Sequence, residues 1–147
     1  MRTLAQIRAT NALAQRDQIA EGQGGGDVLS GFPMLIKADG LLAALAFAVE
    51  LKACRNPDRV DEHFLVRRLD DEQERVFERK HRGEYSIACA IAYHLGCNRP
   101  DGCIAICQAQ SPDDLVEELA QAADASKLRR ATAEALAFLN YLKRFAS

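Results

Sequence analysis

The sequence contains no tryptophan, and aromatic residues make up only 6% of its 147 residues. It also lacks the usual catalytic signatures: there is no G-x-S-x-G nucleophile elbow, no H-E-x-x-H pair and no G-x4-G-K-[ST] phosphate loop. The most apolar run, Leu41 to Val49, is too short for a membrane helix, which needs about 20 residues. The sequence therefore shows no obvious catalytic chemistry, and we expect no cofactor and no membrane helix.

The sequence offers no secretory signal peptide, because Arg2, Arg8 and Arg16 interrupt the amino-terminal segment. Five cysteines are an odd number in a chain without an export signal, which favours reduced thiols over disulfides. The protein is therefore expected in the cytoplasm. Its 19 basic and 21 acidic residues argue against a wholly basic nucleic-acid coat protein, although a local basic face is compatible with that balance.

The sequence is rich in helix-forming residues. No stretch alternates with a period of two, so we expect an all-α fold, a compact bundle of five to six helices in one domain over residues 1–147. A first helix is expected over 2–21, followed by a flexible glycine-rich linker over about 22–31. Pro33 suits the first turn of a helix over 34–52, whose apolar sequence predicts the buried centre of the fold.

The second half of the chain carries further helix signals. The charged segment over about 55–84 is expected to be helical with a narrow buried stripe, and 85–95 is a second apolar run. Gly96 stands where a left-handed cap would end that run. Ser111, followed by a proline and two aspartates, predicts the start of a helix of about 12 residues. Ser126 is placed to cap a last helix that runs nearly to the end of the chain.

The last helix has an apolar and a basic face. At 100° per residue, one side gathers the residues expected to pack on a core, namely Leu128, Ala131, Thr132, Ala135, Leu139, Leu142 and Ala146. The opposite side carries Arg129, Arg130, Asn140, Tyr141 and Arg144. Residues 126–147 have a net charge of +4, because five basic residues accompany one glutamate, whereas residues 85–125 have a net charge of −5. Positive charge is therefore concentrated on the last helix.

This basic face has two physical interpretations. Guanidinium groups beside a tyrosine can bind phosphates by charge-assisted hydrogen bonds and offer a ring to a base or sugar. Basic side chains near the end of a helix also complement the helix dipole, and exposed arginines usually form only a solvated face. The residue pattern alone leaves both interpretations open.

Two segments resemble a known family. Residues 128–146, LRRATAEALAFLNYLKRFA, are similar to the signature EAL-x-FL-x-aromatic-LKRFA that ends the small-subunit family of type III-B CRISPR effector complexes, the fifth protein of the Cmr module. Residues 32–36, FPMLI, together with Gly40–Leu41 and Leu45–Phe47, are similar to the family's P-x-M-I-x-x-NGL…LAF segment. The two segments cover roughly 40 residues of the chain.

The resemblance implies a non-enzymatic helical protein that stacks in several copies along the backbone filament of an RNA-guided antiviral complex. Its partners would be the other Cmr subunits, especially the backbone subunits, copies of itself, and the crRNA and target RNA whose duplex it helps to hold. Base pairing would read the sequence, so this subunit would contact phosphates. The candidate RNA-binding residues are Arg129, Arg130 and Arg144, followed by Lys143, Lys37 and Arg16.

A group of possible metal ligands supports a different hypothesis about function. His94, Cys97, Cys103 and Cys107 form the pattern H-x2-C-x5-C-x3-C around a turn, and zinc prefers four such ligands. The alternative function is a cytosolic helical protein-interaction or metal-sensing module that uses this cluster. Because C-x5-C across a turn is no standard zinc knuckle and cysteine is commonly a small buried residue, we expect no metal here.

Overall fold

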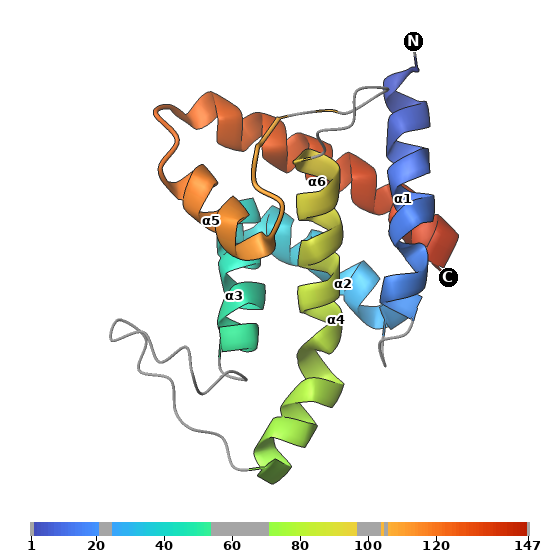
Figure 1. Cartoon of the computed structure of the whole chain (residues 1–147), viewed down its shortest axis with the longest axis vertical. Helices are drawn as coiled ribbons and strands as arrows, with labels where there is room; N and C mark the ends of the chain where they lie inside the picture. The colour runs from blue at the N-terminus through green and yellow to red at the C-terminus, as the bar shows by residue number, and fades with distance from the viewer. Residues whose placement is uncertain (1, 21–24, 54–70, 97–103, 105, 147) are drawn as a thin grey trace.

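The computed structural model describes residues 2–20, 25–53, 71–96, 104 and 106–146. Within these residues the chain forms six α-helices and no β-strand (Figure 1). The helices are α1 (Leu4–Ala20), α2 (Gly25–Asp39), α3 (Leu41–Ala53), α4 (Asp71–Leu95), α5 (Pro112–Ala120) and α6 (Ala125–Ala146). The predicted all-α fold is confirmed. No described helix is both long and apolar enough to cross a membrane.

Helix α1 begins with a capping box. The backbone N–H of Thr3 donates to Oε1 of Gln6 at 2.8 Å, and the backbone N–H of Gln6 donates to Oγ1 of Thr3 at 3.2 Å. These reciprocal bonds satisfy two donors at the start of the helix that have no intrahelical partner. The helix expected over residues 2–21 is confirmed, with ends at Leu4 and Ala20.

The glycine-rich segment differs from its prediction. Of the linker expected over about 22–31, residues 22–24 lie outside the described residues, and 25–31 belong to α2. Leu29 and Phe32 on this helix are only 2% and 3% exposed. Their burial supplies the packing energy that glycine-rich sequence lacks, so tertiary contact overrides the weak local preference for helix.

Gly40 divides the single helix that was expected over 34–52. It adopts φ = +94°, a conformation that side chains with a Cβ rarely take, and it separates α2 from α3. The backbone N–H of Gly40 still donates to the carbonyl oxygen of Ile36 at 2.8 Å, so hydrogen bonding continues up to the break. Pro33 lies inside α2 and not in its first turn.

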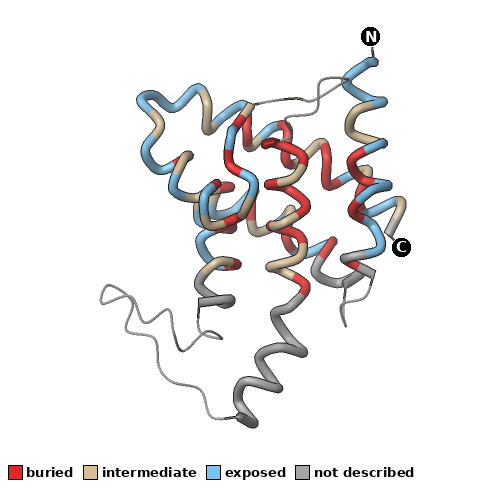
Figure 2. The backbone as a smooth tube through the Cα atoms, viewed as in Figure 1, coloured by how far each residue is buried: buried red, intermediate tan, exposed pale blue. Residues whose placement is uncertain are grey.

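Helix α4 lies at the centre of the bundle and packs against all five other helices (Figure 1). Most of its last turns are buried (Figure 2), including Ile87, Ile91 and Leu95 at 0% exposure. The buried centre was predicted in residues 34–52, but α3 leaves Phe47 41% exposed. An apolar composition shows that a helix can be buried, whereas the number of neighbours is decided by the tertiary arrangement.

The charged segment lies partly within the described structure. Its residues 71–84 form the first half of α4, as expected, whereas residues 54–70 lie outside the described part of the chain. Gly96 follows α4, but it does not take the predicted left-handed conformation. A Cβ at Gly96 would collide with the carbonyl oxygen of Ala109, because the segment before α5 passes directly over it. Close backbone approach therefore explains the glycine.

The N-terminal ends of α5 and α6 are capped by local hydrogen bonds. Ser111 caps α5 as predicted, with its Oγ accepting from the backbone N–H of Asp114 at 3.2 Å. At α6 the expected cap was Ser126, but the Oδ1 atom of Asp124 accepts from the backbone N–H of Ser126 at 2.8 Å. Aspartate precedes the helix here and reaches its unpaired amide, so the cap lies two residues earlier than predicted.

Candidate nucleic-acid interface

The two ends of α6 carry exposed basic residues. Arg129 and Arg130 lie in the second turn of the helix, Lys143 and Arg144 lie in its last turn, and all four are exposed. At 1.5 Å rise per residue the two pairs are about 20 Å apart along the helix axis. The exposed residues between them include Ala133 and Asn140, which carry no charge. The surface of α6 therefore presents two separated basic ends.

The buried face of α6 corresponds closely to the prediction. Ala131, Ala135, Leu139 and Leu142 are buried, while Leu128 and Thr132 are half-buried. Two further residues are buried that the prediction did not include: Glu134 and Phe138. Tyr141, predicted on the basic side, is half-buried and packs against Phe145 with ring centroids 6.4 Å apart. Its ring is therefore only partly available to a ligand.

The remaining candidate cations lie on other helices. Lys37 is exposed in the last turn of α2, and Arg16 is exposed on α1. Nε of Arg16 lies 3.6 Å from Oδ1 of Asp17, so the charge of Arg16 is partly balanced at the surface. Both helices pack against α6, which places these two residues on elements that border the basic face.

Lys127 adds little to the basic face because it is paired. Its Nζ lies 2.8 Å from Oε2 of Glu118, and this bond raises the pKa of Lys127. Burial opposes the ionisation of Glu118, but hydrogen bonds from Lys127 and from the backbone N–H of Gln108 outweigh it and lower its pKa. Both side chains are therefore charged and directed to each other.

Glu134 is the sole acidic residue of α6, and it is turned into the bundle with 7% exposure. Nε and Nη2 of Arg8 on α1 donate to its Oε1 and Oε2 at 2.6 and 2.7 Å. Nε2 of His94 on α4 lies 2.9 Å from Oε1, and Nδ2 of Asn11 lies 2.8 Å from Nδ1 of the same ring. The ring of His94 also stacks on Phe138 at 4.3 Å between centroids. We call Arg8, Asn11, His94 and Glu134 the polar cluster.

Hydrogen-bond geometry assigns the protonation of the polar cluster. The side-chain Nδ2 of Asn11 can only donate, so Nδ1 of His94 accepts and the ring proton lies on Nε2, which donates to Glu134. Burial lowers the pKa of His94, in agreement with a neutral ring. Burial opposes the charge on Glu134, but its bonds from Arg8 and His94 outweigh burial and lower its pKa. The carboxylate is therefore ionised and neutralised inside the protein.

The polar cluster changes the charge that α6 shows to its surroundings. If Glu134 faced outward, its carboxylate would weaken the attraction of the neighbouring arginines for an anion. Because Arg8 neutralises it in the interior, the exposed face of α6 carries cations and no carboxylate. The arrangement can hold anionic groups by charge and hydrogen bonding without any covalent chemistry.

Of the four candidate metal ligands, the structure describes only His94 and Cys107. Both ring nitrogens of His94 are engaged within the polar cluster, and Cys97 and Cys103 lie outside the described residues. Cys107 is buried, and burial together with its hydrogen bond to Glu118 raises its pKa to about 12. Metals bind the thiolate, which this environment disfavours. The described part of the chain contains no group of three or more potential metal ligands.

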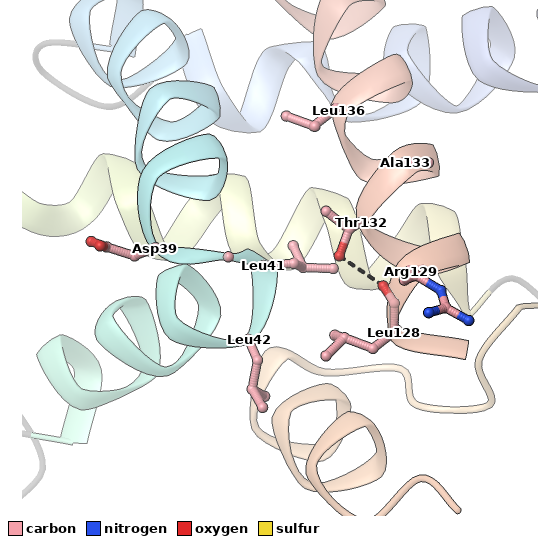
Figure 3. A pocket seen from close by; sticks show the side chains of 9 residues that line it. Asp39, Leu41, Leu42, Leu128, Arg129, Thr132, Ala133 and Leu136 are labelled. Atoms are coloured by element: carbon pink, nitrogen blue, oxygen red, sulfur yellow. Dashed lines mark hydrogen bonds between the residues drawn. The ribbon is translucent and has the colours of Figure 1, made fainter. Parts of the chain in front are cut away.

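A shallow apolar pocket of about 500 Å³ lies beside the basic face (Figure 3). It is formed between the α2–α3 break and α6, where Leu41 and Leu128 lie among the lining side chains. Arg129 lies on the α6 side, and Asp39 lies on the α2 side. Thr132 within the wall donates its hydroxyl proton to the carbonyl oxygen of Leu128 at 2.7 Å, which leaves the lining largely apolar.

Sequence reasoning missed the α1 side of this site. Arg8, Asn11 and Gln15 follow a helical spacing of three and four residues, and the last two are buried. The sequence did contain one signal, the weak apolar stripe of α1. A helix that has few apolar residues and still packs on a core must bury some of its polar residues. The partners of those residues could not be identified from the spacing alone.

The comparisons with known proteins agree with this architecture. The model of a family described as CRISPR-associated protein (Cas_Cmr5) matches residues 4–147. No curated protein and no solved structure matches the chain.

Proposed function

The chain belongs to the Cmr5 family of CRISPR-associated proteins, and from that premise we propose that it is a non-catalytic small subunit of a type III-B Cmr ribonucleoprotein complex. In this proposal it stacks in several copies along the backbone filament and helps to hold the guide RNA–target RNA duplex during antiviral defence. Its partners are the other Cmr subunits, the backbone subunits above all, together with the crRNA and target RNA. It acts in the cytoplasm.

The exposed face of α6 supports this role. It carries cations at both ends, and the one carboxylate of the helix is neutralised in the interior by Arg8. Cations on a rigid helix suit phosphate groups, which are present at every position of an RNA strand. Such contacts are independent of base sequence, as they must be when a guide strand reads the target by base pairing.

Charge reversal at the two basic ends of α6 tests the proposal. The double variant Arg130→Glu and Arg144→Glu, co-expressed with the other Cmr subunits, should be absent from the complex or leave a complex with reduced affinity for target RNA. The single variant Arg2→Glu is the control, because Arg2 is exposed outside α6. Circular dichroism of the free variants checks that they remain helical.

The readouts separate the two contributions of α6. Co-purification reports incorporation into the complex. Filter binding at increasing salt reports phosphate binding, because the salt dependence becomes shallower when fewer phosphates are neutralised. Normal incorporation together with unchanged RNA affinity at physiological salt would refute the assignment of α6 as an RNA-contacting helix.

A further inference from the structure

Helix α1 is attached to the bundle largely through polar groups. Among its described residues, Asn11, Ala12, Gln15 and Ile19 are buried, while Ile7 and Ala9 are only partly buried. The helix packs most extensively against α6, and it also packs against α4. Because Ala12 and Ile19 are the only described apolar side chains of α1 that are fully buried, we expect its attachment to depend strongly on the polar cluster.

The polar cluster is satisfied in one protonation state. With His94 neutral, Nδ1 accepts from Asn11 and Nε2 donates to Glu134, so each ring nitrogen has a suitable partner. The charges of Arg8 and Glu134 cancel across two hydrogen bonds. A proton on Nδ1 would face the N–H group of Asn11, so the present bond would be lost and the amide would have to turn to present Oδ1.

Within the described part of the chain, no further acidic group lies near His94 to neutralise the positive charge that a second ring proton would bring. The charged groups that face the ring are Arg8 from α1 and Glu134 from α6. Helices α2, α3 and α5 also pack against α4, and their described buried side chains are all apolar. His94 itself has 0% exposure. Protonation would therefore leave an uncompensated positive charge in the interior.

We propose that the polar cluster is a pH-dependent switch in which protonation of His94 at Nδ1 breaks the bond to Asn11 and releases α1 from α4 and α6, while the other helices stay packed. The switch is a property of the fold and does not depend on the proposed RNA contacts. Release would uncover the surface of α6 around Glu134, which Arg8 of α1 now covers. An element held by few apolar contacts is a natural site of such local opening.

Amide hydrogen exchange of the full chain, followed between about pH 7.5 and pH 5, measures the switch directly. After correction for intrinsic exchange rates, α1 should lose protection while α6 and the end of α4 keep theirs. The opening equilibrium should rise by up to about tenfold per pH unit while His94 titrates. NMR of the imidazole nitrogens in the same samples reports when His94 becomes protonated.

The isosteric variant Asn11→Asp should reverse this dependence. A carboxylate at that position accepts from a protonated Nδ1, and the cluster of Asp, Arg8, protonated His94 and Glu134 is then neutral. Helix α1 of this variant should stay protected at acidic pH and loosen as His94 loses its proton. Asn140→Asp, an exposed position on α6, adds the same charge and should behave like the natural protein.

Three results would overturn the proposal. Helices α1 and α6 could lose protection together, His94 could become protonated while α1 stays protected, or His94 could stay neutral until the whole chain unfolds. The exchange profile of the natural sequence decides among these outcomes even if Asn11→Asp does not fold.

Discussion

Arg8 of α1 holds both carboxylate oxygens of Glu134 on α6, across 126 positions of sequence, at 2.6 and 2.7 Å. Paired hydrogen bonds of this kind between a guanidinium and a carboxylate are among the strongest polar contacts in proteins. This pair joins the first helix to the last and keeps the single acidic side chain of α6 out of the basic face.

The first prediction concerns the stability that this pair provides. Glu134→Gln removes the negative charge and leaves the half-buried Arg8 without a counter-ion, so the free energy of unfolding should fall by about 2–4 kcal/mol. Urea denaturation followed by circular dichroism measures the change. Glu117→Gln makes the same substitution at an exposed position of α5 and should stay within about 0.5 kcal/mol of the natural protein. Equal stability of the two variants would contradict the assigned role of Glu134.

The second prediction concerns pH. The pKa of His94 and the pKa of Glu134 are both lower in the folded protein, so the unfolded chain binds protons more readily than the fold. The contribution of neutral His94 to the free energy of unfolding is therefore fully present above the ordinary pKa of histidine, about 6.5. It decreases as the pH is lowered below that value. Glu134 adds a further loss below its ordinary value of about 4.5.

His94→Gln separates these two contributions, since glutamine does not titrate. The dependence of stability on pH should become flatter between about pH 6.5 and pH 5, whereas the loss at lower pH should remain. Urea midpoints across this range measure it. A variant with the same pH profile as the natural protein would show that the His94 ring contributes no proton linkage.

The third prediction compares two glycines. Gly96→Ala places a Cβ against the carbonyl oxygen of Ala109, and because backbone must move to relieve the contact, stability should fall by about 2 kcal/mol or more. Gly31→Ala lies inside α2 with nothing within 4 Å of the new Cβ, and it should raise stability by about 0.5–1 kcal/mol. Thermal unfolding of both variants tests the opposite signs.

The fourth prediction compares two cations of α6, one paired with a carboxylate and one directed to solvent. Lys127→Gln should leave the affinity of the assembled complex for target RNA nearly unchanged, because Lys127 is bound to Glu118 at 2.8 Å. Arg130→Gln should lower that affinity and make its salt dependence shallower, by about 0.7 in the logarithmic slope for each phosphate that the complex no longer neutralises. If the two variants weaken binding equally, the Glu118–Lys127 pair does not withhold Lys127 from RNA.

Some local features of this fold were predictable from sequence, whereas contacts between distant residues were not. Ser111 caps α5 within its own turn, and the apolar face of α6 follows from the spacing of residues such as Ala131 and Leu139. The positive φ of Gly40 depends on how α2 and α3 both pack on the core, so a single helix was expected there.

The candidate site shows the same division. The exposure of Arg129, Arg130 and Arg144 was predicted correctly from helical periodicity. The inward position of Glu134 was not predicted. Its partner Arg8 is at the other end of the sequence, and the spacing of residues within α6 does not identify that partner. Gly96 was recognised as special, but the reason is its close approach to Ala109 and not its backbone conformation.

If α6 contacts RNA as proposed, the spacing of its two basic ends sets the length of strand that one copy contacts. At about 3.4 Å per nucleotide along one strand, a separation of about 20 Å corresponds to about six nucleotides. A strand that meets both ends would pass over Ala133 and Asn140, which carry no charge and leave room for its sugars. The length of one helix would thus determine how many nucleotides each copy covers.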